Sequence, residues 1–537
     1  MFSVTKAIEL IPLRRALLSI VVICFVVVSV FSVHASEQPR IQTDKGAVAG
    51  KLSEDGAIRE FLGIPYAQPP VGPLRWRPPQ PATHWNATFQ ATEFGKRCIQ
   101  SGAYYDILFR DAGESEDCLT LNVWAPAKRA GQKLPVMVWF YGGGFNMGGT
   151  SEARQDGTNL ARKGVIVVSM NFRLGIFGFY AHSELSAESK HHASGNYGLL
   201  DQIAALEWVR RNISAFGGDP KSVTIFGESA GSSAVSCHMI SPLSKGLFVR
   251  AIGESGSAFK RKGLAYPRLT VAEKEDEEFA KDAFGNASLA KLRSLPVETL
   301  LKAALRKDPV APRFQPVIDG YFFPEEPAAI FASHQQSDVP MLVGWNRDEG
   351  TNQVVNSPEK LTVAGLQATA KADFGSAAAE FTKVYAAADD QQATRAAEDY
   401  ASDKFIAFAT WAWLEAQAQS GHAPIYRYYF AMDQPGDPLH SKSIGTFHSD
   451  DIEYVFGNLD SRKGATWRPA DYKLSEEMQT YWTNFAKTGD PNSPGLPHWP
   501  MYKAQTNWQV MHLDDTPTAE PDAHRDRFLF LNSVWGN

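Results

Sequence analysis

Cysteine is scarce in this sequence, with four residues among 537, and no Cys-x-x-Cys or His-x-x-x-His pair occurs. Those spacings are typical of zinc sites, so we expect no metal ion, and no other motif indicates a cofactor. Basic residues are not in excess either, because the chain has 53 Lys and Arg but 59 Asp and Glu, which gives a formal net charge of -6. Such a chain lacks the positive surface that phosphate backbones require, which excludes a nucleic-acid partner.

The chain has a single long apolar run, from Ala16 to Val33, so no later segment is expected to span a membrane. Basic residues precede this run and the small residues Val33 and Ala35 end it, an order typical of an export signal peptide cleaved after Ala35. Because the run exceeds the usual signal core of about 7–15 residues, a retained membrane anchor stays open. Residues 1–35 are therefore predicted to be a leader. The protein is expected to be secreted or periplasmic, without membrane contact unless the leader is retained.

Three cysteines lie outside this leader. Cys98 and Cys118 flank a short polar loop, and an oxidising compartment allows them to pair. A disulfide across a loop of this length stabilises a fold by roughly 3 kcal/mol in the chain-entropy model. Cys237 is predicted to be a buried packing thiol.

Internal repeats and low-complexity linkers are absent too, and 44% of the residues are hydrophobic. Near-continuous apolar runs at 134–141 and 163–170 are typical of strands buried on both faces of a mainly parallel sheet. Apolar residues at helical spacing from 199 to 213 predict a crossover helix leading into a strand at 222–226. We expect residues 36–537 to form a single α/β domain with a mainly parallel sheet, flanking helices and a small antiparallel hairpin at 46–67. Further helices are expected near 260–335, 355–420 and 474–489.

The segment TIFGESAGSSAV, residues 224–235, places Ser229 between Gly227 and Gly231, the spacing of a nucleophile elbow. Taken alone this spacing is weak evidence, but a predicted strand precedes it and a predicted helix follows, as the elbow requires. A similar segment, GESGS at 253–257, lacks the last glycine and is interpreted as structural.

A serine hydroxyl is a poor nucleophile, so it needs a base and hydrogen-bond donors for the oxyanion that forms after attack. The segment YGGGF, residues 141–145, follows a predicted strand, and its glycines let backbone N–H groups converge on one point. Ala230, the residue after the serine, offers another donor. The base is not identified by spacing, since the chain has 13 histidines.

Four segments together resemble the type-B carboxylesterase and cholinesterase family of α/β-hydrolases. They are EDCLTLNVWAP at 116–126, VWFYGGGF at 138–145, FGGDPKSVTIFGESAG at 216–231 and FHSDDIEYVFG at 447–457. The resemblance extends from Gly46 to the last helix and implies an α/β-hydrolase fold. It also implies a set of site residues: the triad Ser229, Glu349 and His448, the oxyanion donors Gly143, Gly144 and Ala230, a Cys98–Cys118 disulfide, and a buried ion pair between Arg75 and Glu116.

The resemblance therefore implies a serine carboxylesterase that acts on small-molecule esters through an acyl-enzyme. Glu228, next to the serine, is either a stabiliser of the imidazolium or a structural carboxylate. The loop between the two cysteines lacks the tryptophan that grips choline in cholinesterases, although Tyr104, Tyr105 and Phe109 offer another aromatic face. We expect uncharged or weakly polar esters. Hydrolysis of thioesters, lactones or amides, a non-catalytic binding module, and the choice between monomer and homodimer stay open.

Overall fold

The computed structural model describes residues 38–100, 102, 107–129, 132–260, 265–307, 311–436 and 445–536, together with Met1. By their contacts the residues divide into Met1–Pro39 and a compact unit, Arg40–Asn537, described below. The predicted leader and its cleavage site therefore lie outside the described residues. Within the described part of the chain, no helix is both long and apolar enough to cross a membrane.

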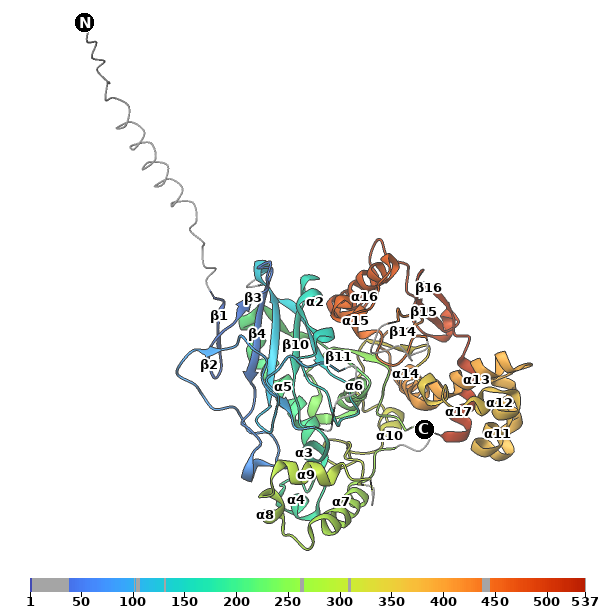
Figure 1. Ribbon diagram of the computed structural model, residues 1–537, viewed down its shortest axis with the longest axis horizontal. Helices are drawn as coiled ribbons and strands as arrows, with labels where there is room; N and C mark the ends of the chain where they lie inside the picture. The colour runs from blue at the N-terminus through green and yellow to red at the C-terminus, as the bar shows by residue number, and fades with distance from the viewer. Residues whose placement is uncertain are drawn as a thin grey trace. The chain divides into compact units, whose positions relative to one another are not determined.

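A twisted sheet forms the centre of the compact unit (Figure 1). Among the described residues eleven strands contribute to it, in the order β16 (Thr518–Pro521), β15 (Gln509–Leu513), β14 (Ile425–Phe430), β13 (Met341–Asn346), β12 (Arg250–Glu254), β11 (Gly218–Glu228), β9 (Leu134–Phe140), β10 (Ile166–Met170), β8 (Thr120–Pro126), β4 (Ile58–Pro65) and β3 (Lys51–Leu52). The strands from β10 to β15 pair in parallel, and those toward both edges pair antiparallel. The mainly parallel α/β sheet predicted from the apolar runs is thus confirmed.

The apolar runs form strands because both faces of the sheet are covered. Every residue of β10, β13 and β14 is buried, as continuous apolar runs require. Helix α5 (Tyr197–Asn212) connects β10 to β11 and crosses β9, which lies between them in the sheet. The predicted crossover helix is therefore present, and its apolar side chains Leu199, Leu206 and Val209 are buried.

The predicted antiparallel hairpin is present as β3 and β4, but the first part of its predicted span joins another sheet. Strand β2 (Gly46–Ala49) pairs with β1 (Arg40–Thr43) and β5 (Phe89–Gln90) in a separate three-stranded sheet, whereas β3 pairs with β4 in the central sheet. The chain passes between the sheets at Gly50, where an added Cβ would lie 2.3 Å from the Glu60 carbonyl oxygen. The short strands β6 (Arg97–Cys98) and β7 (Glu114–Ser115) form a two-stranded sheet.

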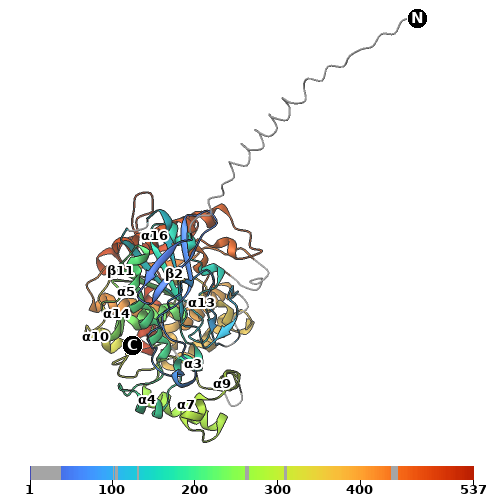
Figure 2. The ribbon, with the colours of Figure 1, turned by 90° about the vertical axis from the view of Figure 1, so that its left-hand side faces the viewer.

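Two groups of helices are inserted after β12 and β13, as expected (Figures 1 and 2). The first comprises α7 (Leu269–Phe284), α8 (Leu289–Arg293), α9 (Val297–Ala304) and α10 (Pro327–Ala332). Both views show α7 beside α4 (Ser183–Glu188). The second comprises α11 (Val363–Phe374), α12 (Ala378–Val384), α13 (Asp390–Ser402) and α14 (Phe408–Ser420), and α12 and α14 contact α17 (Arg525–Trp535).

The remaining helices lie against the sheet or at the ends of its strands. They are α2 (Thr158–Arg162), α3 (Gly175–Phe179), α6 (Ala230–Ile240), α15 (Ile452–Phe456) and α16 (Pro469–Thr488). Helix α16 ends at Gly489, whose φ of 83° is a left-handed cap, where the sequence predicted the stop. It begins at Pro469, before the predicted start at 474, because its first turn is polar and gives no apolar period.

Candidate active site

Ser229 occupies a strained turn between β11 and α6. Its φ of 56° and ψ of -119° lie in a region that side chains rarely adopt, and this conformation presents the hydroxyl at the end of the strand. The turn is crowded, since a Cβ added at Gly231 would lie 1.9 Å from the carbonyl oxygen of Phe140. The two glycines of the Gly-x-Ser-x-Gly spacing are therefore required by close backbone packing.

An imidazole and a carboxylate complete a hydrogen-bonded chain with this serine. Nε2 of His448 lies 2.8 Å from Ser229 Oγ, and Nδ1 lies 2.5 Å from Glu349 Oε2. The three residues come from the β11–α6 turn, the segment after β13 and the loop before α15. The structure thus brings together the three residues that the resemblance implied, although up to 219 positions separate them.

The Glu349 carboxylate is held by two further hydrogen bonds. Oε1 accepts from Ser255 Oγ at 2.5 Å and from the Asn346 backbone N–H at 2.8 Å. Ser255 belongs to the segment 253–257, which the sequence analysis set aside as structural. It has a φ of 56°, the same as Ser229, and follows the neighbouring strand β12. This contact was not predicted, and the repeated Gly-Glu-Ser after a strand is the sequence signal that indicates it.

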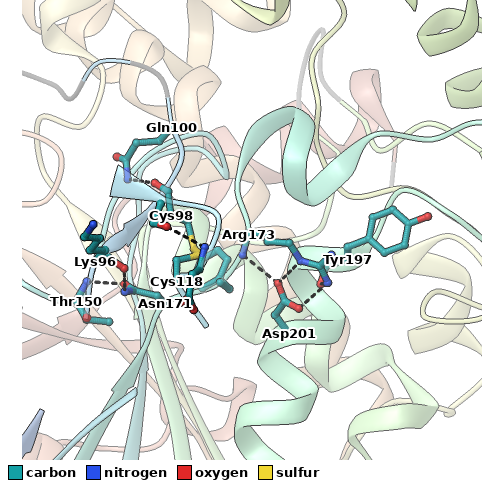
Figure 3. Close-up of a disulfide and its surroundings, with 12 residues drawn as sticks. Lys96, Cys98, Gln100, Cys118, Thr150, Asn171, Arg173, Tyr197 and Asp201 are labelled. Atoms are coloured by element: carbon teal, nitrogen blue, oxygen red, sulfur yellow. Dashed lines mark hydrogen bonds and ion pairs between the residues drawn. A yellow bond between two sulfur atoms is a disulfide. The ribbon is translucent and has the colours of Figure 1, made fainter. Parts of the chain in front are cut away.

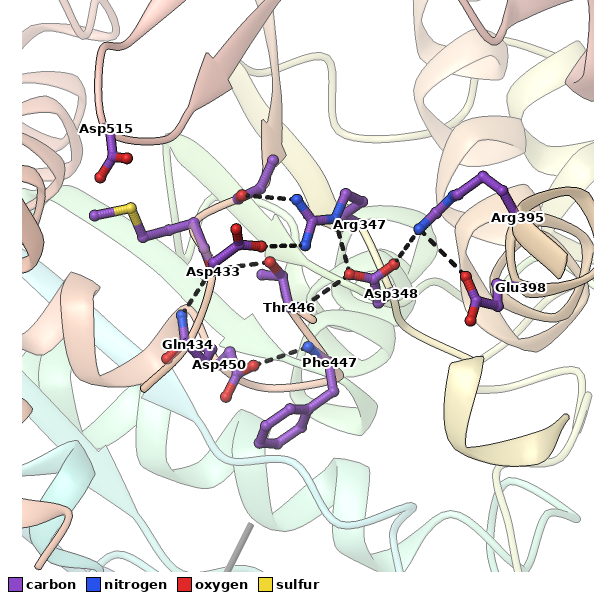
Figure 4. A network of polar contacts seen from close by, with 12 residues as sticks. Arg347, Asp348, Arg395, Glu398, Asp433, Gln434, Thr446, Phe447, Asp450 and Asp515 are labelled. Carbon is purple, nitrogen blue, oxygen red and sulfur yellow. Dashed lines mark hydrogen bonds and ion pairs between the residues drawn. The ribbon is translucent and has the colours of Figure 1, made fainter. Parts of the chain in front are cut away.

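A polar network fixes the loop that carries the histidine relative to the segment that carries the acid (Figure 4). The Asp348 N–H donates to the Thr446 carbonyl at 2.9 Å, and the Thr446 N–H donates to the Asp348 carboxylate at 2.8 Å. Arg347 and Arg395 also contact the Asp348 carboxylate, at 2.8 and 2.6 Å. Because Asp348 precedes Glu349 and Thr446 lies two positions before His448, this network sets the distance between base and acid.

Three more carboxyl groups are buried behind the histidine. Glu228 Oε1 lies 3.3 Å from His448 Nε2, Glu254 accepts from the Trp482 indole at 2.7 Å, and Asp451 accepts from the Tyr428 hydroxyl at 2.8 Å. Burial raises the pKa of Glu228 to about 8 and that of Asp451 to about 6, and it raises the pKa of Glu254 well above its usual range. Of these three residues, only Glu228 was predicted to lie at the site.

The charge of the imidazole depends on these neighbours. Burial lowers the pKa of His448, but the negative charges of Glu228 and Glu349 and the hydrogen bond that Nδ1 donates to Glu349 outweigh burial and raise the pKa to about 9. The site therefore favours the imidazolium, which is the form that a base reaches after it takes a proton from serine.

The glycine-rich loop after β9 lies beside the serine. Gly143 and Gly144 have φ values of 97° and 65°, and both line the same cavity as Ser229 and Ala230. Neither glycine N–H donates a hydrogen bond to another described residue. Both amides are therefore available to an oxyanion.

The predicted disulfide supports this loop (Figure 3). Cys98 and Cys118 are bonded and buried. Two residues beyond Cys98, the Gln100 amide both donates to the Gly148 carbonyl and accepts from the Gly148 N–H, each at 2.9 Å. Gly148 closes the glycine-rich loop, so the disulfide-linked segment holds the loop in place. Cys237 is buried with no disulfide partner among the described residues.

The predicted ion pair lies away from the reacting groups. Arg75 contacts Glu116 with two hydrogen bonds of 2.7 Å each. Its guanidinium also donates to the backbone carbonyls of Arg293 and Leu295, at 2.9 and 2.7 Å. Arg75 thereby connects the first helical insertion to the segment that begins with Glu116.

A cavity of about 360 Å³ opens onto the serine. Apolar and aromatic side chains form much of its wall, among them Phe145, Phe259, Tyr266, Phe405 and Phe447. Phe109, proposed as an aromatic face for the substrate, packs under the Arg97 guanidinium at 4.5 Å instead, and Tyr104 and Tyr105 lie outside the described residues. In the part of the chain that is described, no cluster of three or more His, Cys, Asp or Glu side chains is arranged to hold a metal ion.

Comparison with known proteins identifies the family. The model of the carboxylesterase family matches residues 37–529. The fumonisin B1 esterase of Sphingopyxis macrogoltabida is 38% identical over 87% of this chain and 86% of that protein, and the para-nitrobenzyl esterase of Bacillus subtilis is 36% identical over 91% and 97%. A solved PNB esterase structure, 34% identical, superposes with a TM-score of 0.78 over 92% of this chain and 99% of that chain. The chain therefore belongs to the carboxylesterase family, has the α/β-hydrolase fold and is a carboxylic ester hydrolase.

Proposed function

We propose that Ser229, His448 and Glu349 form the catalytic triad of this hydrolase and that the reaction proceeds through an acyl-enzyme. The observation that carries this proposal is the unbroken hydrogen-bonded chain from Ser229 Oγ through both imidazole nitrogens to Glu349, at 2.8 and 2.5 Å. These are the separations that proton transfer from a nucleophile to its base requires.

In the first half-reaction, His448 Nε2 takes the proton of Ser229 as Oγ attacks the ester carbonyl carbon. Glu349 keeps the imidazole in the tautomer that carries its proton on Nδ1 and stabilises the imidazolium that forms. The tetrahedral intermediate collapses, Nε2 returns the proton to the departing alcohol, and an acyl-serine remains. In the second half-reaction water attacks the acyl-serine with His448 again as base, and the carboxylic acid is released.

The backbone N–H groups of Gly143, Gly144 and Ala230 receive the oxyanion in both half-reactions. Support for this role comes from their position in the wall of the cavity beside Ser229 and from the lack of described partners for the two glycine amides. Removal of one such donor costs about 10²–10³-fold in kcat in other serine hydrolases. We assign Glu228 to stabilising the imidazolium, since its carboxylate lies 3.3 Å from Nε2.

The test is hydrolysis of p-nitrophenyl acetate, butyrate and hexanoate by the parent, by Ser229→Ala and by Ser53→Ala, a serine in the exposed turn between β3 and β4. We expect Ser229→Ala to lose about four to six orders of magnitude in kcat. The Ser53→Ala control is expected to match the parent. A fluorophosphonate probe should label the parent once and leave Ser229→Ala unlabelled. Hydrolysis by Ser229→Ala at the parental rate contradicts the assignment.

We also propose that residues 1–35 are an export signal and that residues 36–537 form one secreted or periplasmic domain. The basic, apolar and small-residue order of the first 35 positions supports export, and so does the buried disulfide, which forms in oxidising compartments. Expression with the leader followed by N-terminal sequencing tests this, and the expected first residue is Ser36. A product in the cytosol that retains Met1 contradicts it.

A further inference from the structure

One cationic side chain in the wall of the catalytic cavity has no counter-charge among the residues that the structure describes. Arg154 in the same wall pairs with Glu152 at 2.8 Å, and His448 pairs with Glu349. Arg313 also lines the cavity and is exposed, yet its guanidinium makes no hydrogen bond or ion pair with any residue that the structure describes. A guanidinium has five N–H donors and stays protonated, so the cavity holds a fixed positive charge available to a ligand.

The backbone beneath this guanidinium is anchored. Phe314 is buried and packs against Phe279 and Tyr180, with ring centroids 5.4 and 6.3 Å apart. Val317 is buried and exchanges two hydrogen bonds with the Asn196 side chain, at 2.7 and 2.9 Å. Arg313 thus extends from a fixed segment between α9 and α10, and binding at this position costs little backbone entropy.

Arg313 stands where the catalytic cavity meets a second one. A neighbouring cavity of about 380 Å³ shares Ala265, Arg313 and Gln315 with it, and the Gln315 amide donates to the Ala265 carbonyl at 3.5 Å. Glu275 and Asp276 line the second cavity but not the catalytic one, and neither approaches the guanidinium within 4 Å. The positive charge is therefore available at the end of the catalytic cavity.

We infer that Arg313 is a specificity residue that binds a carboxylate carried by the substrate, so that the preferred esters are anionic at a position remote from the reacting carbonyl. Guanidinium and carboxylate form paired, charge-assisted hydrogen bonds, and partial removal from water inside a cavity strengthens them. The inference rests on the proposed ester hydrolysis at Ser229. It replaces the expectation of uncharged or weakly polar esters by esters that carry a carboxylate away from the reacting carbonyl.

The carboxylate can belong to the acid or to the alcohol part of the ester, and two pairs of substrates distinguish these sources. Monophenyl adipate and phenyl hexanoate share an acyl chain length, and only the first carries a carboxylate on the acid side. The 4-(butanoyloxy)phenylacetate anion and phenyl butanoate differ in the same way on the alcohol side. For each pair the readout is the ratio of kcat/KM for the anionic ester to kcat/KM for the neutral ester, measured by phenol release.

The variants are Arg313→Gln, Arg313→Lys and a matched control, Arg210→Gln. Arg210 lies on α5, is exposed and does not line the catalytic cavity, so its substitution changes the net charge equally. We expect Arg313→Gln to lower the ratio about tenfold or more in one pair, which identifies the side that carries the carboxylate. Arg210→Gln should leave the ratio within twofold of the parent, and Arg313→Lys should give an intermediate ratio because it keeps the charge without the guanidinium fork.

An unchanged ratio in both pairs for Arg313→Gln overturns the inference. A ratio for Arg313→Lys no higher than that for Arg313→Gln also contradicts a role based on charge. A parent enzyme that hydrolyses none of the four esters speaks against the proposed function instead, so the two failures are distinguishable.

Discussion

Substitution of Glu228 by Gln tests how the buried carboxylates control the base. The carboxylate of Glu228 lies 3.3 Å from His448 Nε2 and is one of the negative groups that raise the pKa of the imidazole. Gln keeps the shape of the side chain and removes the charge. The pKa of His448 should therefore fall in Glu228→Gln, and the acid limb of kcat/KM against pH, which reports loss of the neutral base, should move to lower pH.

The expected fall in the pKa of His448 depends on the distance between the two side chains and on the protonation state of Glu228. Two unit charges about 4 Å apart interact by about 4 kcal/mol at an effective dielectric constant of 20, which is about three pKa units at 1.36 kcal/mol each. Burial raises the pKa of Glu228 to about 8, so this carboxyl is largely protonated at neutral pH but mostly charged near pH 9, where His448 titrates. We expect a displacement of about one to three pKa units. The rate above the limb should fall about tenfold or more, because the imidazolium loses the same stabilisation.

The assay is kcat/KM for p-nitrophenyl butyrate from pH 5 to 10 in the parent, in Glu228→Gln and in Glu254→Gln. Glu254 is a matched control, since it is a neighbouring buried carboxyl that contacts Trp482 and does not approach His448 within 4 Å. Its substitution should move the limb less than Glu228→Gln does. An acid limb of Glu228→Gln that stays in place or moves to higher pH would refute the electrostatic account of the base.

Three further changes test the framework of the site. Ser255→Ala removes a 2.5 Å hydrogen bond to Glu349 and should lower kcat about tenfold with little change in KM, as steady-state kinetics can show. Gly231→Ala places a Cβ 1.9 Å from the Phe140 carbonyl oxygen and should abolish soluble expression or lower Tm sharply, whereas a parental Tm contradicts the packing argument. Cys118→Ser should cost about 3 kcal/mol of folding stability, measured by denaturant unfolding, and dithiothreitol should then leave the variant unchanged.

Most of the fold could be predicted because its strands are buried on both faces and therefore read as continuous apolar runs. Strands β9 and β10 are examples, since all of their residues except Pro135 are buried. In the entry region the hairpin of β3 and β4 could be predicted from short strand-like runs and turn residues, but the pairing of β2 could not. The strands of this region are two to eight residues long, and their pairing depends on which sheet each strand joins after Gly50, a choice that the local sequence does not encode.

The residues of the site also differ in whether the local sequence predicts them. Ser229 and the glycine-rich loop carry local signals, because a strained turn and converging amides require particular small residues nearby. His448 has no local signal, since its position depends on the hydrogen bonds between Asp348 and Thr446 across 98 positions. Glu254 and Asp451 were missed for the same reason. Each is polar and buried, and only the tertiary fold shows that both lie behind the imidazole.

Four buried carboxyl groups, those of Glu228, Glu254, Glu349 and Asp451, raise the question of which of them carries the negative charge. Hydrogen bonds supply an answer, because donors to a carboxylate favour its charged form. Glu349 accepts from the Ser255 hydroxyl, the Asn346 N–H and His448, whereas Glu254 accepts from the Trp482 indole. With few donors, burial dominates at Glu254 and raises its pKa well above its usual range. Three donors around Glu349 thus favour a negative charge on the carboxylate that contacts Nδ1, and burial of Glu254 disfavours a further charge nearby, which reduces the repulsion between carboxylates.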